Sequence, residues 1–191
     1  MKALILDSST KLLYVCLVWD DRIVYEKYTE GKNDHAKNIV YQVDEALKQA
    51  KLETSDLDRI VIGYGPGSYT GVRMAVTVGK MMAVFKRIPL YVISTLRLMS
   101  SGKAGICRAA IDARRGNAFS CVLNMDTDEM ILNEGLYSYD ELNQYACDCE
   151  VRDDAFTVNP FYCINHSSLV SEPHLLVPNY LRETEAERKL V

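Results

Sequence analysis

The sequence lacks any apolar run of the length that a membrane-spanning helix requires, which argues against a helical membrane protein over the residues given. The apolar residues 1–6 are too few for the core of a signal peptide and are followed at once by Asp7, so we expect no secretory leader. Positive charge is scarce as well: 22 Lys and Arg residues stand against 26 Asp and Glu residues, a net charge of −4. Because phosphate binding relies on clustered Lys and Arg, this balance argues against unaided binding of RNA or DNA.

Motifs for metal binding and nucleophilic catalysis are also sparse. The six cysteines contain no Cys-x-x-Cys pair, and Cys147-x-Cys149 has no second pair to complete a zinc site. The three histidines are scattered, and no Ser-His-Asp or Cys-His set can be assembled from the sequence. In a chain without a leader the cysteines are expected to be reduced thiols, so we expect a cytoplasmic protein.

What the sequence does contain is the composition of a globular protein, with 48% apolar and 25% charged residues. Hydrophobic periodicity predicts the order β-β-β-α-β-α-β-α, followed by β-β-β-α and shorter pieces. The predicted strands are residues 2–6, 12–19, 23–28, 59–62, 89–93, 105–111, 118–123 and 130–136, with short strands at 157–158 and 162–164. The predicted helices are residues 35–50, 72–86, 95–101 and 139–147, with a terminal helix or tail at 183–190.

The predicted order repeats itself. Each half opens with three strands and then a helix, and the first strand of each half ends at an aspartate, Asp7 or Asp112. This repetition indicates a structural duplication with a truncated second copy, and an α/β architecture unlike a Rossmann fold, which would begin β-α-β. We expect an N-terminal lobe over residues 1–100 and a smaller C-terminal lobe over residues 101–191.

A glycine-rich loop, residues 63–71, joins the predicted strand 59–62 to the helix after it. It fails the Walker A pattern, because no Gly-Lys-Ser/Thr follows at the required distance, and its third glycine, Gly71, is one residue late for the dinucleotide fingerprint. Two interpretations remain open with equal weight: an anion site at a helix N-terminus, or a tight turn shaped by Pro66 and the glycines.

The helix predicted over residues 72–86 is apolar on almost every side, and Lys80 is nearly its only charge. A helix of this kind either lies wholly inside its own protein or meets another chain with its outer face. In a protein of this size we favour a partner interface, and methionines in the middle of the helix suit an adaptable surface.

Four segments carry a resemblance to a known family: residues 4–10, 65–73 (GPGSYTGVR), 111–116 (IDARRG) and 179–182 (NYLR). Together they resemble the TsaB (YeaZ) family, a subunit of the bacterial machinery that makes N6-threonylcarbamoyladenosine in tRNA. The resemblance implies a two-lobed α/β fold of the actin/Hsp70/sugar-kinase-like (ribonuclease H-like) class with a truncated second lobe. It implies a catalytic TsaD-like paralogue bound through helices of the first lobe, with a TsaE-like ATPase nearby.

The resemblance also implies where ligands would and would not bind. The catalytic relative holds a metal with two histidines four residues apart; here His35 lies at the matching helix start, but position 39 is Ile39. We therefore expect no metal site and a surface position for His35. ATP and metal are expected on the partner subunits, no cofactor tightly on this chain, tRNA only through the complex, and no membrane partner.

Residues 7–10 match the first phosphate hairpin of the fold. Their hydroxyls and amides could bind phosphate, with Asp7 holding a hydrated Mg²⁺, or they could satisfy local backbone amides, which is the interpretation we favour. The second phosphate hairpin is replaced by residues 113–116, Ala-Arg-Arg-Gly, whose arginines could contact tRNA phosphate, an acidic partner surface or a neighbouring carboxylate. We expect vestigial phosphate loops made of Asp7, Ser8, Ser9, Thr10, Gly65, Gly67, Ser68, Thr70 and Gly71.

Our main hypothesis is a non-catalytic scaffold that activates a TsaD-like threonylcarbamoyl transferase. Without that partner, the same helices should form a homodimer. The alternative is an ATP-binding phosphotransferase or ATPase of the same fold that acts alone, using Asp7 and residues 65–71. The predicted partner interface consists of Ile39, Val43, Leu47, Met74, Val78, Met81, Met82 and Phe85.

Overall fold

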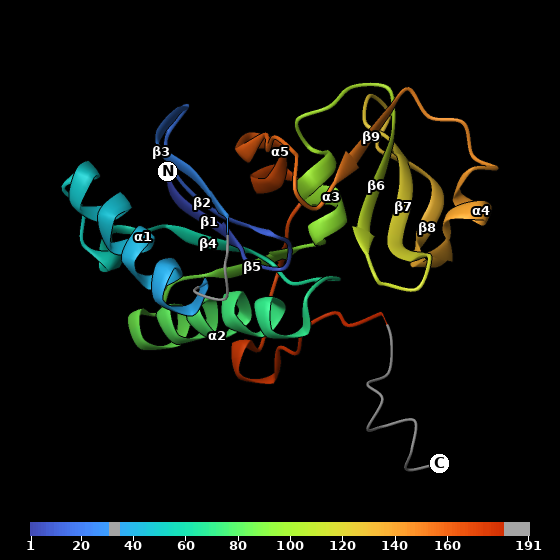
Figure 1. Ribbon diagram of the computed structural model, residues 1–191. Helices are drawn as coiled ribbons and strands as arrows, with labels where there is room; N and C mark the ends of the chain where they lie inside the picture. The colour runs from blue at the N-terminus through green and yellow to red at the C-terminus, as the bar shows by residue number, and fades with distance from the viewer. Residues whose placement is uncertain (31–34, 182–191) are drawn as a thin grey trace, which may run out of the picture.

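The computed structural model describes residues 1–30 and 35–181 and contains two β-sheets that lie side by side (Figure 1). The first sheet has six strands in the order β10-β5-β4-β1-β2-β3. The chain enters it as an antiparallel meander, and β4 and β5 then add parallel strands beside β1. These strands are β1 (Lys2–Asp7), β2 (Leu12–Trp19), β3 (Arg22–Glu30), β4 (Arg59–Gly63), β5 (Leu90–Ile93) and β10 (Ser168–Leu169).

The second sheet repeats the plan of the first with fewer strands. Its order is β8-β7-β6-β9, and β9 runs parallel to β6 just as β4 runs parallel to β1. The predicted duplication is therefore visible in the topology, and the second copy departs from the first after β9, where the helix that follows packs against β1 of the first sheet. Its elements are β6 (Ile106–Asp112), β7 (Asn117–Asn124), β8 (Glu129–Ser138), α4 (Tyr139–Leu142) and β9 (Cys149–Arg152).

Helices cover both faces of the first sheet (Figure 1). On one face, α1 (His35–Ala50) and α2 (Tyr69–Lys86) pack on a core that includes Leu4, Leu6 and Ile62. On the other face, α3 (Thr95–Ser100) and α5 (Pro160–Asn165) share a second core with the second sheet. Alternating strand residues supply the two cores, Leu4 and Leu6 to one, Ala3 and Ile5 to the other, as strand pleating requires.

The predicted strands and helices of the first 100 residues are confirmed, with α2 beginning three residues earlier than predicted. Ser68 caps α2 by accepting a hydrogen bond from the Gly71 amide, so the glycine-rich segment winds into the first turn. The capping box predicted at Ser138 is present, but the helix that it opens ends at Leu142 and not near residue 147.

Two strands predicted for the second half are wrong, and two strands that form there were missed. Residues 162–164 are part of α5, because Asn159 caps a helix that Pro160 starts. Residues 157–158 form no strand, whereas β9 and β10 were missed. Both missed strands are short, four and two residues, which leaves little periodicity to detect.

The boundary predicted near residue 100 stays a prediction, although the last part of the described chain returns to the first lobe. β10 pairs with β5, and the short 3₁₀ helix η2 (Pro173–Leu175) lies against α2. The predicted tail at 183–190 and the side chain of His35 fall outside what the structure describes. A second 3₁₀ helix, η1 (Thr54–Asp56), precedes β4, and no described helix is both long and apolar enough to span a bilayer.

Candidate functional site

Two loops meet at the start of α2, and glycines allow their backbones to touch. The Ser68 amide donates to the Ser9 carbonyl at 2.7 Å, and the Ser8 hydroxyl donates to the Gly71 carbonyl at 2.7 Å. A Cβ atom on Gly71 would lie 2.0 Å from the Ser8 carbonyl oxygen, and one on Gly67 would lie 2.2 Å from that of Ser9. Close backbone packing thus explains these two glycines without an anion.

Asp7 lies at the end of β1, but its carboxylate points into the protein and not toward solvent. It is fully buried and accepts hydrogen bonds from the Thr95 hydroxyl at 2.7 Å and the Ser9 amide at 2.6 Å. Burial raises the pKa of Asp7 above its usual value, although both hydrogen bonds act to lower it. Gly63 makes room for this carboxylate, since a Cβ atom there would lie 1.6 Å from its Oδ2 atom.

A cavity of about 810 Å³ opens between the two lobes in front of these loops. Of the nine residues predicted as vestigial phosphate loops, six line it together, while Asp7, Ser8 and Gly65 do not. The six are Ser9, Thr10, Gly67, Ser68, Thr70 and Gly71. Sequence reasoning did not include Tyr69, inside the glycine-rich loop, or Lys11, directly after residues 7–10, and it missed Asp153 because that residue is far from both loops in the sequence.

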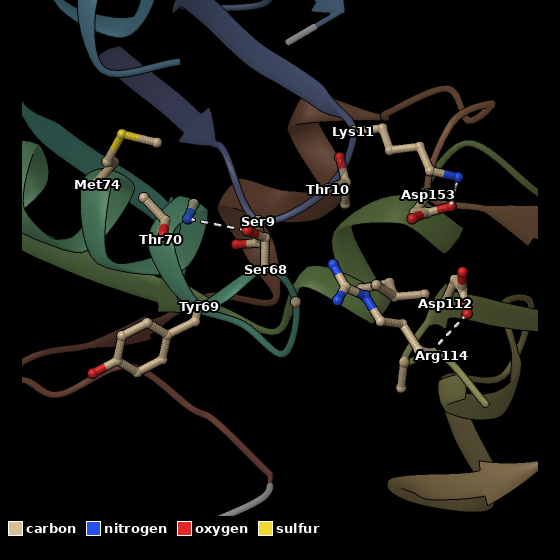
Figure 2. Close-up of a pocket in the computed structure, with 14 residues that line it drawn as sticks. Ser9, Thr10, Lys11, Ser68, Tyr69, Thr70, Met74, Asp112, Arg114 and Asp153 are labelled. Atoms are coloured by element: carbon tan, nitrogen blue, oxygen red, sulfur yellow. Dashed lines mark hydrogen bonds and ion pairs between the residues drawn. The ribbon is translucent and has the colours of Figure 1, made fainter. Parts of the chain in front are cut away.

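The charges around this cavity nearly balance. Lys11 lies 3.2 Å from the carboxylate of Asp153 and 3.3 Å from that of Asp154. Burial raises the pKa of Asp153, while Lys11 acts to lower it. Figure 2 shows the guanidinium of Arg114 reaching from the β6–β7 hairpin toward the Ser68 loop, with Asp112 beside it. Two basic and two acidic side chains, Lys11, Arg114, Asp112 and Asp153, therefore line the cavity.

The helix α2 has two distinct faces. Residues facing the sheet are buried: Gly71, Val72, Ala75, Val76, Gly79 and Ala83. A Cβ atom on Gly79 would lie 2.7 Å from Ile62, so the helix rests directly on the sheet. On the opposite face Phe85 is 77% exposed and Met81 is 54% exposed, while Met74, Val78 and Met82 are partly exposed. The described residues therefore leave Met81 and Phe85 of α2 uncovered.

For three of the eight predicted interface residues, the prediction is wrong. Ile39, Val43 and Leu47 lie on the face of α1 that packs onto the sheet, and each is buried in the same core as Leu4 and Ile62. They satisfy the apolar periodicity of an amphipathic helix by burial within the chain, although Ile39 also borders a groove at the start of α2.

The exposed apolar residues of α1 were missed instead. Val40 and Tyr41 are 59% and 55% exposed and lie outside the regular apolar stripe of the helix. Near the start of α2 lies a groove of about 440 Å³, and its lining includes Ile39, Met74 and Val78. Exposed Tyr69 forms one side of this groove and stacks against Tyr180, with ring centroids 5.2 Å apart. Only the exposure of their side chains in the structure distinguishes Val40 and Tyr41 from the core residues of α1.

Within the described part of the chain, no three or more His, Cys, Asp or Glu side chains are grouped so that they could hold a metal ion. His166 stacks on Tyr162 at a centroid distance of 3.8 Å, and His174 lies in η2. Neither histidine borders the cavity between the lobes.

Comparison with known sequences identifies the family. Residues 28–155, more than half of the chain, match the family described as TsaD: tRNA N6-adenosine threonylcarbamoyltransferase. The chain belongs to this family. It is 34% identical to TsaB of Bacillus subtilis over 123 residues, which is 63% of this chain and 54% of that protein. It is 32% identical to TsaB of Escherichia coli over 124 residues, 62% of this chain and 53% of that protein.

These alignments confirm the predicted relationship to TsaB (YeaZ), and the chain spans about half the length of the curated relatives it matches. Two solved structures establish the fold. YeaZ from Pseudomonas aeruginosa superimposes with a TM-score of 0.75 at 22% identity, covering 94% of this chain and 99% of the other. A Pseudomonas aeruginosa protein described as similar to peptidase YEAZ gives 0.77 at 23% identity, covering 95% and 99%. The predicted two-lobed α/β fold is confirmed.

Proposed function

We propose that this chain is a non-catalytic subunit in the biosynthesis of threonylcarbamoyladenosine in tRNA, the process named in the descriptions of its TsaB relatives. Its role would be to bind a TsaD-like threonylcarbamoyl transferase and hold it in an active arrangement. The observation that carries this proposal is the uncovered apolar face of α2 around Met81 and Phe85.

This face has the properties of a protein interface. Phe85 and Met81 are large apolar side chains one helical turn apart, so they form one continuous patch on the surface. Val40 and Tyr41 are further exposed apolar side chains on α1, which contacts α2. The groove lined by Met74 and Val78 offers a pocket into which a partner side chain could insert, the arrangement found at binding hot spots.

The interior of the molecule supports the same proposal. Asp7 is fully buried against Gly63 and accepts hydrogen bonds from Thr95 and Ser9, which favours a structural role for its carboxylate over the binding of a hydrated Mg²⁺. The alternative of an independent ATPase would rest on that carboxylate and on a cavity wall that carries Asp112 and Asp153. We therefore assign ATP and metal to the partner subunits, a TsaD-like transferase and a TsaE-like ATPase, and contact with tRNA to the assembled complex.

The test is co-purification with TsaD from the same organism. Phe85→Asp and Met81→Asp place a charge in the centre of the patch and should weaken binding about 30-fold or more, the effect of losing a hot-spot contact of about 2 kcal/mol. Both side chains are exposed, so the fold should hold. Ile131→Asp, on β8 of the other lobe and also exposed, is the matched control and should bind normally.

Unchanged TsaD binding by both α2 variants would contradict the proposed interface. The complementary measurement is modification of tRNA, reconstituted with and without this chain, where activity should require the chain and be reduced by Phe85→Asp. Tight Mg·ATP binding by the isolated chain that is lost in Asp7→Ala would instead favour an independent ATPase.

The same patch should bring two copies together when no partner is present. Light scattering of the chain alone should give the mass of a dimer, and Phe85→Asp should give a monomer. A wild-type chain that stays monomeric at high concentration would contradict the proposal that this patch forms a dimer interface.

A further inference from the structure

Two cysteines face each other across neighbouring strands of the second sheet. Cys107 in β6 and Cys149 in β9 are direct partners in the parallel ladder, and all six cysteines of the chain are free thiols. In a parallel pair, directly opposed residues project from the same face of the sheet. Cys107 belongs to the core shared with α3, and the side chain of Cys149 packs against that core.

The spacing of the two strands suits a covalent link between these residues. Neighbouring strands lie about 4.8 Å apart. A disulfide accepts Cα separations of about 4.4 to 6.8 Å. None of the other four cysteines has a cysteine as its ladder partner: Cys16 lies opposite Ile5 and Glu26, and Cys121 lies opposite Ala109. Cys107 and Cys149 are therefore the pair that the fold pre-positions.

The two thiols differ in their access to solvent. Cys107 is completely buried beside α3, whereas Cys149 is partly exposed on the edge strand β9. Burial, together with the neighbouring Cys149 thiol, raises the pKa of Cys107 to about 12. A small oxidant thus reaches Cys149 first, and Cys107 lies behind it as the second thiol.

We propose that Cys107 and Cys149 form a reversible disulfide when the protein meets a hydroperoxide. The outer O–H group of hydrogen peroxide is transferred to the Cys149 sulfur, the O–O bond breaks, and one water leaves with the thiol proton. The Cys107 sulfur then attacks the Cys149 sulfenic acid, its S–O bond breaks, and the leaving hydroxide takes the Cys107 proton as a second water. Two thiols and one peroxide become one disulfide and two waters.

Such a link would act on the wall of the cavity between the lobes. β9 runs directly into Asp153 and Asp154, which bind Lys11 of the first lobe, and the Lys11 amide donates to the Asp153 carbonyl at 3.2 Å. Fixing β9 to β6 by a covalent bond would hold this connection in place. The inference does not depend on the proposed function.

The test treats the full chain with graded hydrogen peroxide, blocks the remaining thiols by alkylation, and maps the digested protein by mass spectrometry without reduction. The expected product is one peptide pair linked through Cys107 and Cys149, which dithiothreitol separates. Cys149→Ser and Cys107→Ala should abolish the link. Cys147→Ser, two residues away and also partly exposed, is the matched control and should retain it.

Thermal unfolding of wild type and Cys149→Ser is a second test, which does not require the Cys107→Ala variant to fold. Oxidised wild-type protein should melt about 5 °C or more above the reduced form, because the bond closes a long loop, and Cys149→Ser should show no such rise. Over-oxidation of Cys149 without a link, a link through Cys147 or between chains, or a link that lowers the melting temperature would each overturn the proposal.

Discussion

The two lobes contain the same local turn in different surroundings. In the first lobe β1 ends at Asp7, whose Oδ1 atom accepts a hydrogen bond from the amide of Ser9, two residues on, at 2.6 Å. In the second lobe β6 ends at Asp112, whose Oδ1 atom accepts one from the amide of Arg114 at 2.8 Å. The first turn is buried and the second is exposed.

The two lobes differ in the segment that comes after the parallel neighbour of the first strand. After β4 the chain continues as the glycine-rich loop and α2, which close over Ser8 and Ser9 through backbone contacts. After β9 the chain turns at residues 153–154 and returns to the first lobe, so nothing comparable covers Asp112. The comparison teaches that an aspartate after a first strand predicts a turn, and the next helix decides whether the carboxylate is accessible.

The largest expected effect comes from two glycines, Gly71 in the first turn of α2 and Gly116 in the hairpin between β6 and β7. Gly71→Ala drives a Cβ atom into the backbone of Ser8 and should destabilise the protein by about 3 to 4 kcal/mol or prevent folding. Gly116→Ala meets no atom within 4 Å and carries only the cost of its left-handed backbone, φ +75°, about 1 to 2 kcal/mol. Urea unfolding of both variants checks this order, and equal losses would break the comparison.

A smaller difference is expected for the two aspartates. Asp7→Ala removes the acceptor of two buried donors, the Ser9 amide and the Thr95 hydroxyl, and should cost about 2 to 3 kcal/mol. Asp112→Ala frees an amide that water can reach, so it should cost less than about 1 kcal/mol. Denaturant midpoints at neutral pH measure both, and a cost for Asp112→Ala that matched Asp7→Ala would contradict our account of burial.

The smallest effect is a dependence on pH. Because burial raises the pKa of Asp7 in the folded protein, folding favours its protonated form. Its contribution to stability is complete below the unfolded pKa, about 3.9, and is lost as pH rises through the folded pKa. Wild-type protein should therefore gain stability relative to Asp7→Asn as the pH falls from about 7 to about 4.

Asp128 is the control with the opposite sign. Burial raises its pKa, but hydrogen bonds from Tyr162 and Arg97 outweigh this and hold the pKa below its usual value. Its contribution is present above the unfolded pKa and is lost as pH falls through the folded pKa, so wild-type protein should lose stability relative to Asp128→Asn in acid. Unfolding curves for wild type, Asp7→Asn and Asp128→Asn at each pH measure the two stability differences. If both differences changed in the same direction with pH, the burial of Asp7 would be contradicted.

Much of the fold was predictable because the local signals were strong. The apolar periodicity of α1 indicated both of its ends, and the Ser138–Glu141 capping box marked the start of α4. The start of α2 was missed because three residues, Tyr69, Thr70 and Gly71, have the composition of a loop while Ser68 already caps the helix. β9 was missed because its sequence, Cys-Glu-Val-Arg, has only one buried residue, Val151, and the strand is defined by its pairing with β6.

The candidate site was less predictable. The excess of apolar residues in α2 predicted an exposed apolar surface, and Met81 and Phe85 are exposed, but the apolar periodicity of α1 does not separate the buried Ile39 from the exposed Val40. The sequence grouped the residues of two loops into one predicted site, and six of those nine residues line one cavity. The direction of the Asp7 side chain, however, depends on Thr95, which is 88 residues away.

The sequence by itself determined the order of the elements in the first 100 residues, the duplication and the surplus of apolar side chains on α2, because these depend on composition and spacing along the chain. Only the tertiary structure decided which apolar residues are covered and which carboxylates can meet a ligand. Burial and hydrogen bonding depend on segments far apart in sequence, so the two equivalent aspartates differ: Asp7 is buried in the first lobe and Asp112 is exposed in the second.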